Sequence, residues 1–243
     1  MAQATNTIAL ITGASRVIGF EAARQFGQQG ITVVLTGRNQ EQGTAAIQTL
    51  MAEDLTIDFL ELDVAQAASV TAAAHNIEQT YGKLDILLNN AAAYADWSET
   101  ASSADLAHAQ DVLNINLFGT WRVIQAFLPL LKNSQHGRIV NVSSGAGSHG
   151  EKPFGLTTGP TATSYAVSKA ALNALTVKFA NELKEQRILV NAVDPGLTAT
   201  APGMEQMGAR PVAEGAASVV WAATLPDDGP TGGFFRDGVP LPW

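Results

Sequence analysis

Thr7-Ile-Ala-Leu-Ile11 is a short apolar run typical of a buried parallel strand, and the turn Thr12-Gly-Ala-Ser-Arg-Val-Ile-Gly19 follows it directly. A helical pattern over 20–29 ends at Gly30, and Ile31-Thr-Val-Val-Leu-Thr36 predicts the next strand. This succession is typical of a nucleotide-binding unit, because the helix N-terminus offers backbone N–H groups and its dipole to a pyrophosphate. The turn alone fits a plain helix start in an α/β protein equally well, since its spacing is not Gly-x-Gly-x-x-Gly.

The rest of the chain continues to alternate between strands and helices. Apolar runs predict further strands over 57–62, 84–88, 137–142, 189–193 and 233–235. Helical patterns predict helices over 40–51, 66–81, 104–131, 163–184 and 211–224, and Pro129 weakens the last turns of the long one. We therefore expect an α/β fold with a doubly wound, Rossmann-type parallel sheet of about seven strands, helices on both faces and a single domain over 1–243. A ligand is expected beyond the carboxyl ends of the strands, near the switch point between the first and fourth strands.

Composition and charge exclude several classes of protein. The chain has 243 residues, a net charge of −8 and no cysteine. The negative charge argues against nucleic acid and anionic membranes as partners, and the lack of cysteine excludes disulfides, thiolate catalysis and zinc–cysteine sites. The N-terminus lacks the basic region of a signal peptide, and the histidines show no metal-ligand spacing. We expect a cytoplasmic protein with no membrane span and no metal.

Tyr165 and Lys169 lie four residues apart in Ser164-Tyr-Ala-Val-Ser-Lys169, within a stretch of helical periodicity. At that spacing the two side chains share one helix face, about a turn apart. A nearby ammonium favours phenolate, so Lys169 is expected to lower the pKa of Tyr165 towards the range useful for general acid–base catalysis. Alone, such a pair is more often a solvated helix face.

Five short motifs follow one another along the chain. They are Thr12-Gly-x-x-x-Val17-x-Gly19, Asn89-Asn-Ala-Ala92, Asn141-Val-Ser-Ser144, the Tyr165/Lys169 pair and Pro195-Gly-x-x-x-Thr200. In this order they resemble the motifs of the short-chain dehydrogenase/reductase family, from about Thr7 to the C-terminus. Each motif is only modestly specific, but five in family order are very improbable by chance. The chain is similar to the carbonyl-reductase-like members of that family.

Two positions depart from the family pattern. Val17 stands where the family has the middle glycine of its turn, and Ala92 replaces another glycine. A β-branched residue tolerates positive φ poorly and fills space near the expected cofactor. We therefore expect a slightly displaced loop and weaker dinucleotide binding, but not its loss.

Two arginines bear on the choice of cofactor. Arg38 follows the second strand, where a dinucleotide fold meets the adenosine ribose, and no acidic residue stands there to accept from a 2′-hydroxyl. Arg38 and Arg16 could instead clamp a 2′-phosphate, which favours NADP(H), although two exposed arginines are common on any surface. In the resembling family Asp63 bonds the adenine, and it could also cap a helix. The resemblance implies cofactor contacts from Gly13, Ser15, Arg16, Val17, Ile18, Gly19, Arg38, Asp63, Val64, Asn90, Ala91, Tyr165, Lys169, Pro195, Gly196, Thr198 and Thr200.

The resemblance also implies a catalytic tetrad of Asn116, Ser144, Tyr165 and Lys169. Tyr165 would donate a proton to the carbonyl oxygen in reduction, and Ser144 would hydrogen-bond the same oxygen. Lys169 would lower the pKa of the tyrosine and bind the nicotinamide ribose. Asn116 aligns with the asparagine that holds a water in the proton relay. Asn114 and Ser143 stay as the alternatives to Asn116 and Ser144.

Two irregular segments, near 145–162 and 197–210, are expected beside the active site. The first is rich in glycine and contains Pro153, and the second could serve as a substrate lid. Candidates to line the pocket, each of which could equally be an ordinary core or surface residue, are Tyr94, Trp97, Phe154, Leu156, Met204 and Met207.

The expected function is NADPH-dependent reduction of small or medium ketones and aldehydes, with secondary alcohol oxidation as its reverse. The expected partners are a small-molecule carbonyl or alcohol substrate and, by family resemblance, further copies of the chain in a dimer or tetramer. A noncatalytic NADP(H)-binding regulator is the alternative, which Val17 alone favours. An enzyme of carrier-bound acyl chains is disfavoured, since the chain has only 14 Lys and Arg residues to dock an acidic carrier.

Overall fold

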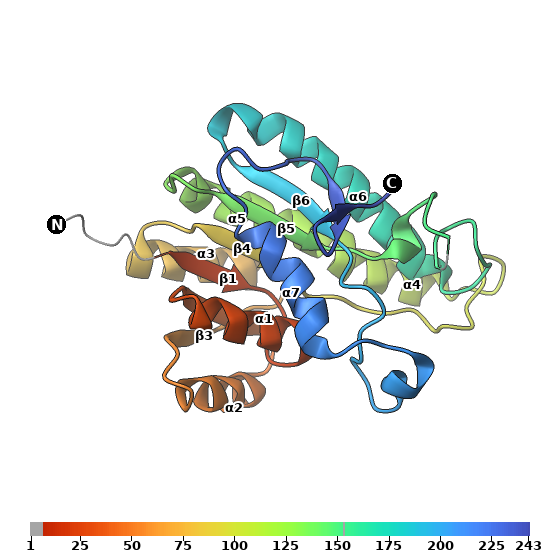
Figure 1. The fold of residues 1–243 in the computed structure, drawn as a ribbon, viewed down its shortest axis with the longest axis horizontal. Helices are drawn as coiled ribbons and strands as arrows, with labels where there is room; N and C mark the ends of the chain where they lie inside the picture. The colour runs from red at the N-terminus through yellow and green to blue at the C-terminus, as the bar shows by residue number, and fades with distance from the viewer. Residues whose placement is uncertain (1–6, 153) are drawn as a thin grey trace.

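The computed structural model describes residues 7–152 and 154–243; residues 1–6 and Pro153, which were included in the predicted domain and irregular segment, lie outside the described residues. At its centre is one sheet of eight strands in the order β3-β2-β1-β4-β5-β6-β7-β8 (Figure 1). The strands are β1 (Ile8–Ile11), β2 (Thr32–Gly37), β3 (Ile57–Glu61), β4 (Ile86–Asn89), β5 (Arg138–Val142), β6 (Leu189–Val193), β7 (Phe234–Arg236) and β8 (Val239–Pro240). All neighbouring pairs are parallel except β7 and β8. The predicted α/β fold is confirmed, with one short antiparallel strand in addition.

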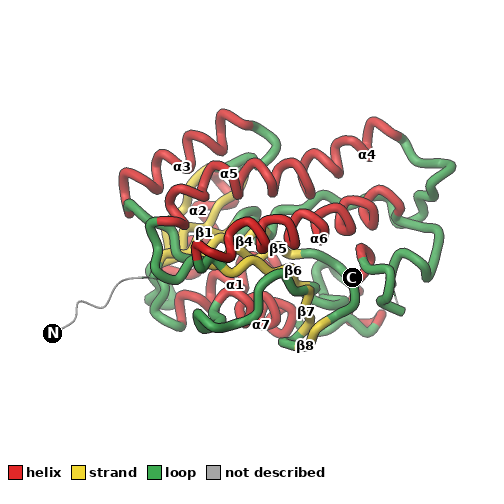
Figure 2. The backbone as a smooth tube through the Cα atoms, turned by 90° about the horizontal axis from the view of Figure 1, so that it is seen from above, coloured by secondary structure: helices red, strands yellow, loops and turns green. Residues whose placement is uncertain are grey.

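Helices cover both faces of the sheet, as Figure 2 shows from above. They are α1 (Val17–Gln28), α2 (Gln40–Met51), α3 (Ala67–Tyr81), α4 (Leu106–Leu113), α5 (Thr120–Lys132), α6 (Thr163–Leu183) and α7 (Val212–Ala223). Apolar residues of α3, α5 and α6 pack in one core cluster, and those of α1, α2 and α7 pack in the other. Successive residues of β1 alternate between the clusters, Ile8 and Leu10 in the first and Ala9 and Ile11 in the second. This explains why the strand is apolar without interruption.

The long helix predicted over 104–131 is not uniform. A π-helical segment, η1 (Asn114–Gly119), separates α4 from α5 without ending the helix. Pro129 lies inside α5, which continues to Lys132, one residue beyond the predicted end. π-Segments are rare in helices and frequent at functional sites, and this one contains Asn116.

The order of the strands reverses its direction at the centre of the sheet. β1 pairs with β2 on one side and with β4 on the other. The chain therefore leaves the carboxyl ends of these two central strands in opposite directions, which opens a crevice above them. The segments that follow β4, β5 and β6 meet at this edge, on the right of Figure 1. None of the described helices is long and apolar enough to cross a bilayer.

Candidate active site

The glycine turn packs against the chain that follows β4. A Cβ built on Gly13 would lie 2.9 Å from Ala91 Cα, and one on Gly19 would lie 2.5 Å from Asn90 Nδ2, so neither position has room for a larger residue. The Asn90 side-chain amide donates to the carbonyl oxygens of Thr12 and Gly13, both at 3.0 Å. The Thr12 hydroxyl accepts from the backbone N–H groups of Asn90 and Ala91. Turn and strand end are thus joined at the predicted switch point.

Val17 begins α1 with a φ of +52°. This left-handed region is especially unfavourable for a β-branched residue and costs about 1–3 kcal/mol. The valine side chain is partly buried against the apolar cluster of α1, α2 and α7, and this contact opposes the strain. The predicted conflict between a β-branched residue and a positive φ is therefore present as backbone strain at Val17. The weaker cofactor binding expected from it stays a prediction.

Val17→Gly is expected to raise the Tm by about 2 °C. Release of the strain outweighs the chain entropy of glycine, about 0.5–1 kcal/mol, and the loss of a partly buried side chain offsets part of the gain. Thermal unfolding followed by circular dichroism measures the shift, and NADPH binding is expected to tighten or stay unchanged. Val17→Ala, which keeps a Cβ in the left-handed region, is the control and should gain less. A lower Tm for Val17→Gly than for the unaltered protein would contradict the strain.

Arg16 and Arg38 are exposed beside the contact between the glycine turn and the end of β2. The two segments meet at Ser15 and Gly37, where a Cβ on Gly37 would lie 3.7 Å from Ser15 Oγ. Within the described chain neither guanidinium takes part in a hydrogen bond or an ion pair. Two uncompensated positive charges therefore flank the place where an adenosine ribose is expected.

Asp63 and Val64 follow β3. Asp63 Oδ1 accepts from the Ala65 N–H at 2.9 Å, whereas the N-cap residue of α3 is Gln66, which makes no side-chain capping bond. The alternative that Asp63 caps this helix is therefore wrong, because its carboxylate closes the preceding turn instead. Val64 is buried against η1, where a Cβ on Gly119 would lie 2.9 Å from its Cγ2.

Tyr165 stands in the first turn of α6 and is 7% exposed. Its ring stacks on that of Tyr94 with a centroid distance of 5.2 Å and meets Trp97 edge-on at 5.8 Å. Burial raises the pKa of Tyr165 well above its ordinary value, the charge of Tyr94 adds to the rise, and a hydrogen bond with Ser144 opposes it. The predicted lowering of this pKa by Lys169 is thus wrong for this structure, because desolvation outweighs the neighbouring charge. The neutral phenol, which is the form that can donate a proton, is the stable one.

Lys169 lies one turn further along α6 and is 2% exposed. Its Nζ donates to the carbonyl oxygen of Val142 at 2.8 Å and lies 5.6 Å from the centroid of the Tyr165 ring. Burial lowers the pKa of Lys169 to about 8, and the carboxylate of Asp194 opposes this shift. The side chain therefore still carries its charge for most of the time at neutral pH, between the end of β5 and the phenol.

The two serines after β5 have different surroundings. The Ser143 hydroxyl is buried and donates to Asn173 Oδ1 at 2.5 Å. The Ser144 hydroxyl accepts from the Ala146 N–H at 3.2 Å at the start of the short 3-10 helix η2 (Gly145–Gly147), and it lies close enough to Tyr165 to oppose the rise in the pKa of that phenol. This difference favours Ser144 over Ser143 as the hydroxyl beside the Tyr165 phenol.

Asn116 joins three parts of the site. Its Nδ2 donates to the Ala93 carbonyl oxygen and to Ser168 Oγ, both at 2.9 Å, and its Oδ1 accepts from the Ala93 N–H at 2.8 Å. These bonds link the segment after β4, the π-segment and α6. Asn116 is 1% exposed, whereas Asn114 is partly exposed, which favours Asn116 of the two.

The segment after β6 begins with a compact turn. Gly196 has a φ of +70°, and its N–H donates to Asp194 Oδ1 at 2.8 Å. The Thr198 hydroxyl is buried and donates to the Pro195 carbonyl oxygen at 3.0 Å. A cofactor contact at Thr198 would therefore come from its main chain.

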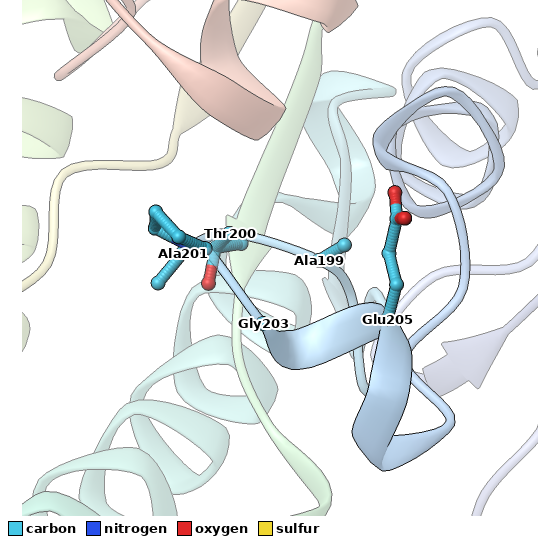
Figure 3. A pocket seen from close by; sticks show the side chains of 6 residues that line it. Ala199, Thr200, Ala201, Gly203 and Glu205 are labelled. Atoms are coloured by element: carbon cyan, nitrogen blue, oxygen red, sulfur yellow. The ribbon is translucent and has the colours of Figure 1, made fainter.

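The predicted lid, 197–210, borders a cavity of about 430 Å³. The residues that line it are Ala199, Thr200, Ala201, Pro202, Gly203 and Glu205. Figure 3 shows that they belong to one stretch of chain, which includes the 3-10 helix η4 (Met204–Met207). The Thr200 hydroxyl donates to Met204 Sδ at 3.4 Å, which ties the start of the lid to η4.

Three charged side chains at the site were not predicted. Asp194, 5% exposed, accepts from the Gly145 N–H at 3.0 Å and from Arg236 Nε at 3.2 Å. Arg236 Nη2 also contacts Glu151 Oε1 at 3.0 Å. The triad ties the irregular segment 145–162 to the ends of β6 and β7. The sequence offered a signal for Asp194, which follows a buried strand and directly precedes the Pro195-Gly196 motif. It offered none for Glu151 and Arg236, which lie far from Asp194 in the sequence.

Glu99 was also missed. Its Oε1 accepts from the Ser164 N–H at 2.7 Å and its Oε2 from the Ser164 hydroxyl at 3.1 Å. Ala162, the residue before α6, has a φ of +52° and no side-chain capping bond. Glu99 therefore caps the helix that carries Tyr165 from 65 positions away, and its charge also suits the helix dipole. No local pattern could have revealed it.

The pocket candidates are unequally placed. Tyr94 and Trp97 contact Tyr165, and Met204 contacts Thr200, whereas Phe154 and Met207 are largely exposed. Leu156 is held in the irregular segment by its N–H, which donates to the Ser148 carbonyl oxygen at 2.8 Å. Over residues 7–152 and 154–243, no group of three or more His, Asp or Glu side chains is placed to hold a metal ion.

Known proteins resemble almost the whole chain. A family model described as short chain dehydrogenase matches residues 7–209. The chain is 34% identical to (+)-neomenthol dehydrogenase of Arabidopsis thaliana, over 97% of either protein. It is 33% identical to the NADPH carbonyl reductase 3 of Mus musculus, over 97% of this chain and 98% of that one. The crystal structure of NADPH-bound carbonyl reductase from chicken fatty liver matches with a TM-score of 0.86 and 26% identity, over 98% of this chain and 99% of that one.

Proposed function

We propose, since the chain belongs to the short chain dehydrogenase family, that it is an NADPH-dependent reductase of small or medium ketones and aldehydes. Membership makes it an oxidoreductase that uses a nicotinamide cofactor. The finer proposal is carried by one observation, the meeting of Tyr165, Lys169 and Ser144 at the carboxyl edge of the sheet. The relatives named for NADPH and for carbonyl reduction support it.

The residues around the switch point fit a dinucleotide. The Gly13 and Gly19 backbone is held against the segment after β4, which leaves the N-terminus of α1 to bind a pyrophosphate. Arg16 and Arg38 carry uncompensated charge that suits a 2′-phosphate, which is why NADP(H) is proposed over NAD(H). The remaining contacts are proposed from Ser15, Val17, Ile18, Asp63, Val64, Asn90, Ala91, Tyr165, Lys169, Pro195, Gly196, Thr198 and Thr200.

The chemistry needs one proton and one hydride. When bound, the nicotinamide supplies the hydride that the carbonyl carbon accepts. Tyr165 gives its phenol proton to the carbonyl oxygen, and Ser144 donates a hydrogen bond to that oxygen as negative charge develops on it. Lys169 then stabilises the phenolate, which is reprotonated from solvent through the region of Asn116. The raised pKa of Tyr165 suits this direction, because the phenol stays protonated until the substrate oxygen becomes the stronger base.

The test is the consumption of NADPH and NADH, measured in parallel by absorbance, with a panel of aliphatic, aromatic and cyclic ketones and aldehydes. Turnover with at least one carbonyl compound, faster with NADPH than with NADH, is the expected result. Turnover with NADH but not with NADPH would contradict the proposed cofactor, while the proposed reduction of a carbonyl group would stand. NADPH binding by fluorescence without turnover of any compound would contradict the reductase.

That last outcome would favour a noncatalytic NADP(H)-binding regulator of the same fold. Two observations point towards it: the strained Val17 in the cofactor turn and the ring of Tyr94 over the proton donor. The proximity of Tyr165, Lys169 and Ser144 points more strongly to an enzyme. A cytoplasmic location and assembly into a dimer or tetramer are further parts of the proposal, and size-exclusion chromatography with light scattering measures the second.

A further inference from the structure

Two large aromatic rings beside the proton donor are open to solvent. Tyr94 is 51% exposed and Trp97 is 64% exposed, although both contact Tyr165, which is 7% exposed. All three rings lie close together, since the centroids of Tyr94 and Trp97 are 6.1 Å apart. Apolar surface of this kind favours burial, and it lies where the reacting carbonyl must come.

The arrangement of the rings leaves an open corner. Tyr94 lies nearly parallel to Tyr165, with 21° between the ring planes, so Tyr165 covers one of its faces, while the residue as a whole is 51% exposed. Trp97 is tilted by 42° to Tyr94 and stands at 61° to Tyr165. A flat or puckered ring can contact the exposed parts of both side chains, beside the ring of Tyr165. A linear ketone covers less of the two aromatic side chains and loses more conformational freedom on binding.

We propose that Tyr94 and Trp97 bind the ring of the substrate, so that the preferred substrates are cyclic or aromatic ketones and not linear ones of the same size. This rests on the proposed reductase function and adds the substrate class. The two side chains act by contact with the substrate, and the proton and hydride follow the path already given.

The experiment compares two ketones of eight carbons, acetophenone and 2-octanone. For the unaltered enzyme kcat/KM is expected to be about 5-fold or more higher for acetophenone. Trp97→Leu and Tyr94→Leu should each lower the acetophenone value about 2- to 12-fold, mainly through KM, because one aromatic contact is lost. The value for 2-octanone should change less than about 2-fold. Tyr94→Phe keeps the ring and should keep the preference.

Trp121→Leu is the matched control. Trp121 is another partly exposed indole, but it packs edge-on against Phe179 and not against Tyr165. This variant should leave the ratio between the two ketones unchanged. Equal losses for both ketones in Trp97→Leu, or no preference in the unaltered enzyme, would overturn the ring site while the reductase function stands.

Binding separates the two proposals. The enzyme loaded with oxidised cofactor, NADP⁺, cannot reduce a ketone, so calorimetric titration with acetophenone and 2-octanone reports affinity without turnover. Tighter binding of acetophenone that Trp97→Leu removes would support the ring site even if no carbonyl compound is reduced, in which case only the reductase function fails. Equal affinity for the two ketones would overturn the ring site whatever the turnover.

Discussion

Tyr165→Phe is expected to lower kcat by roughly 10²–10⁴-fold, the range for loss of a general acid. The substitution removes only the hydroxyl, so the stack on Tyr94 and the burial of the ring are kept. Affinity for NADPH should change little, because the Tyr165 hydroxyl is one of many proposed cofactor contacts and the others are untouched. Steady-state turnover with the best ketone of the panel, and NADPH binding by fluorescence, measure the two effects.

Tyr81→Phe serves as the control for this loss. The Tyr81 hydroxyl bonds Asp58 at the far end of α3 and takes no part in the site. Its removal should leave turnover unchanged within about 2-fold. Appreciable activity in Tyr165→Phe, within about 10-fold of the unaltered enzyme, would show that another group delivers the proton and would remove the assigned mechanism.

Arg38→Glu is expected to weaken NADPH binding by about 100-fold and NADH binding by less than about 3-fold. A charge-assisted hydrogen bond to the 2′-phosphate contributes about 1.5–3 kcal/mol, and the new carboxylate adds repulsion. NADH carries no 2′-phosphate and can accept a bond from its ribose to the carboxylate instead. Binding constants for both cofactors, from fluorescence titration at one ionic strength, give the ratio.

A change of overall charge could imitate part of this result. Lys184→Glu alters the net charge by the same amount on the exposed 3-10 helix η3 (Lys184–Gln186), far along the chain from the cofactor turn. It should weaken both cofactors equally and only slightly. An unchanged preference in Arg38→Glu would show that Arg38 is an ordinary surface charge, and Arg16 would then be the first residue to test.

Local patterns predicted most of the fold. The glycine turn, the central parallel strands and α2 depend on runs of neighbouring residues, and their bounds agree with the structure to within about two residues. β8 was missed because two residues, one of them Pro240, make no apolar run. The π-segment was missed because the apolar period continues through it while only the backbone bonding changes.

The site was less predictable where it depends on contacts distant in sequence. The spacing of Tyr165 and Lys169 indicates a nearby charge, but the pKa of the phenol is controlled by burial beneath Tyr94. No motif indicates the role of Glu99, because its partner Ser164 lies 65 positions away in the sequence. The functional roles of the individual site residues therefore stay predictions, which the variants above test.

The cap that Glu99 places on α6 has a consequence for the way the chain folds. A helix with its own N-cap can form its first turn early, from local sequence alone. The first turn of α6 instead closes a contact across 65 positions, so it is completed only after the segment beyond β4 has docked. Tyr165 lies in that turn, so the geometry around it depends on a contact between segments distant in the sequence. A chain in which the segment beyond β4 has not docked lacks the Glu99 cap on the turn that carries Tyr165.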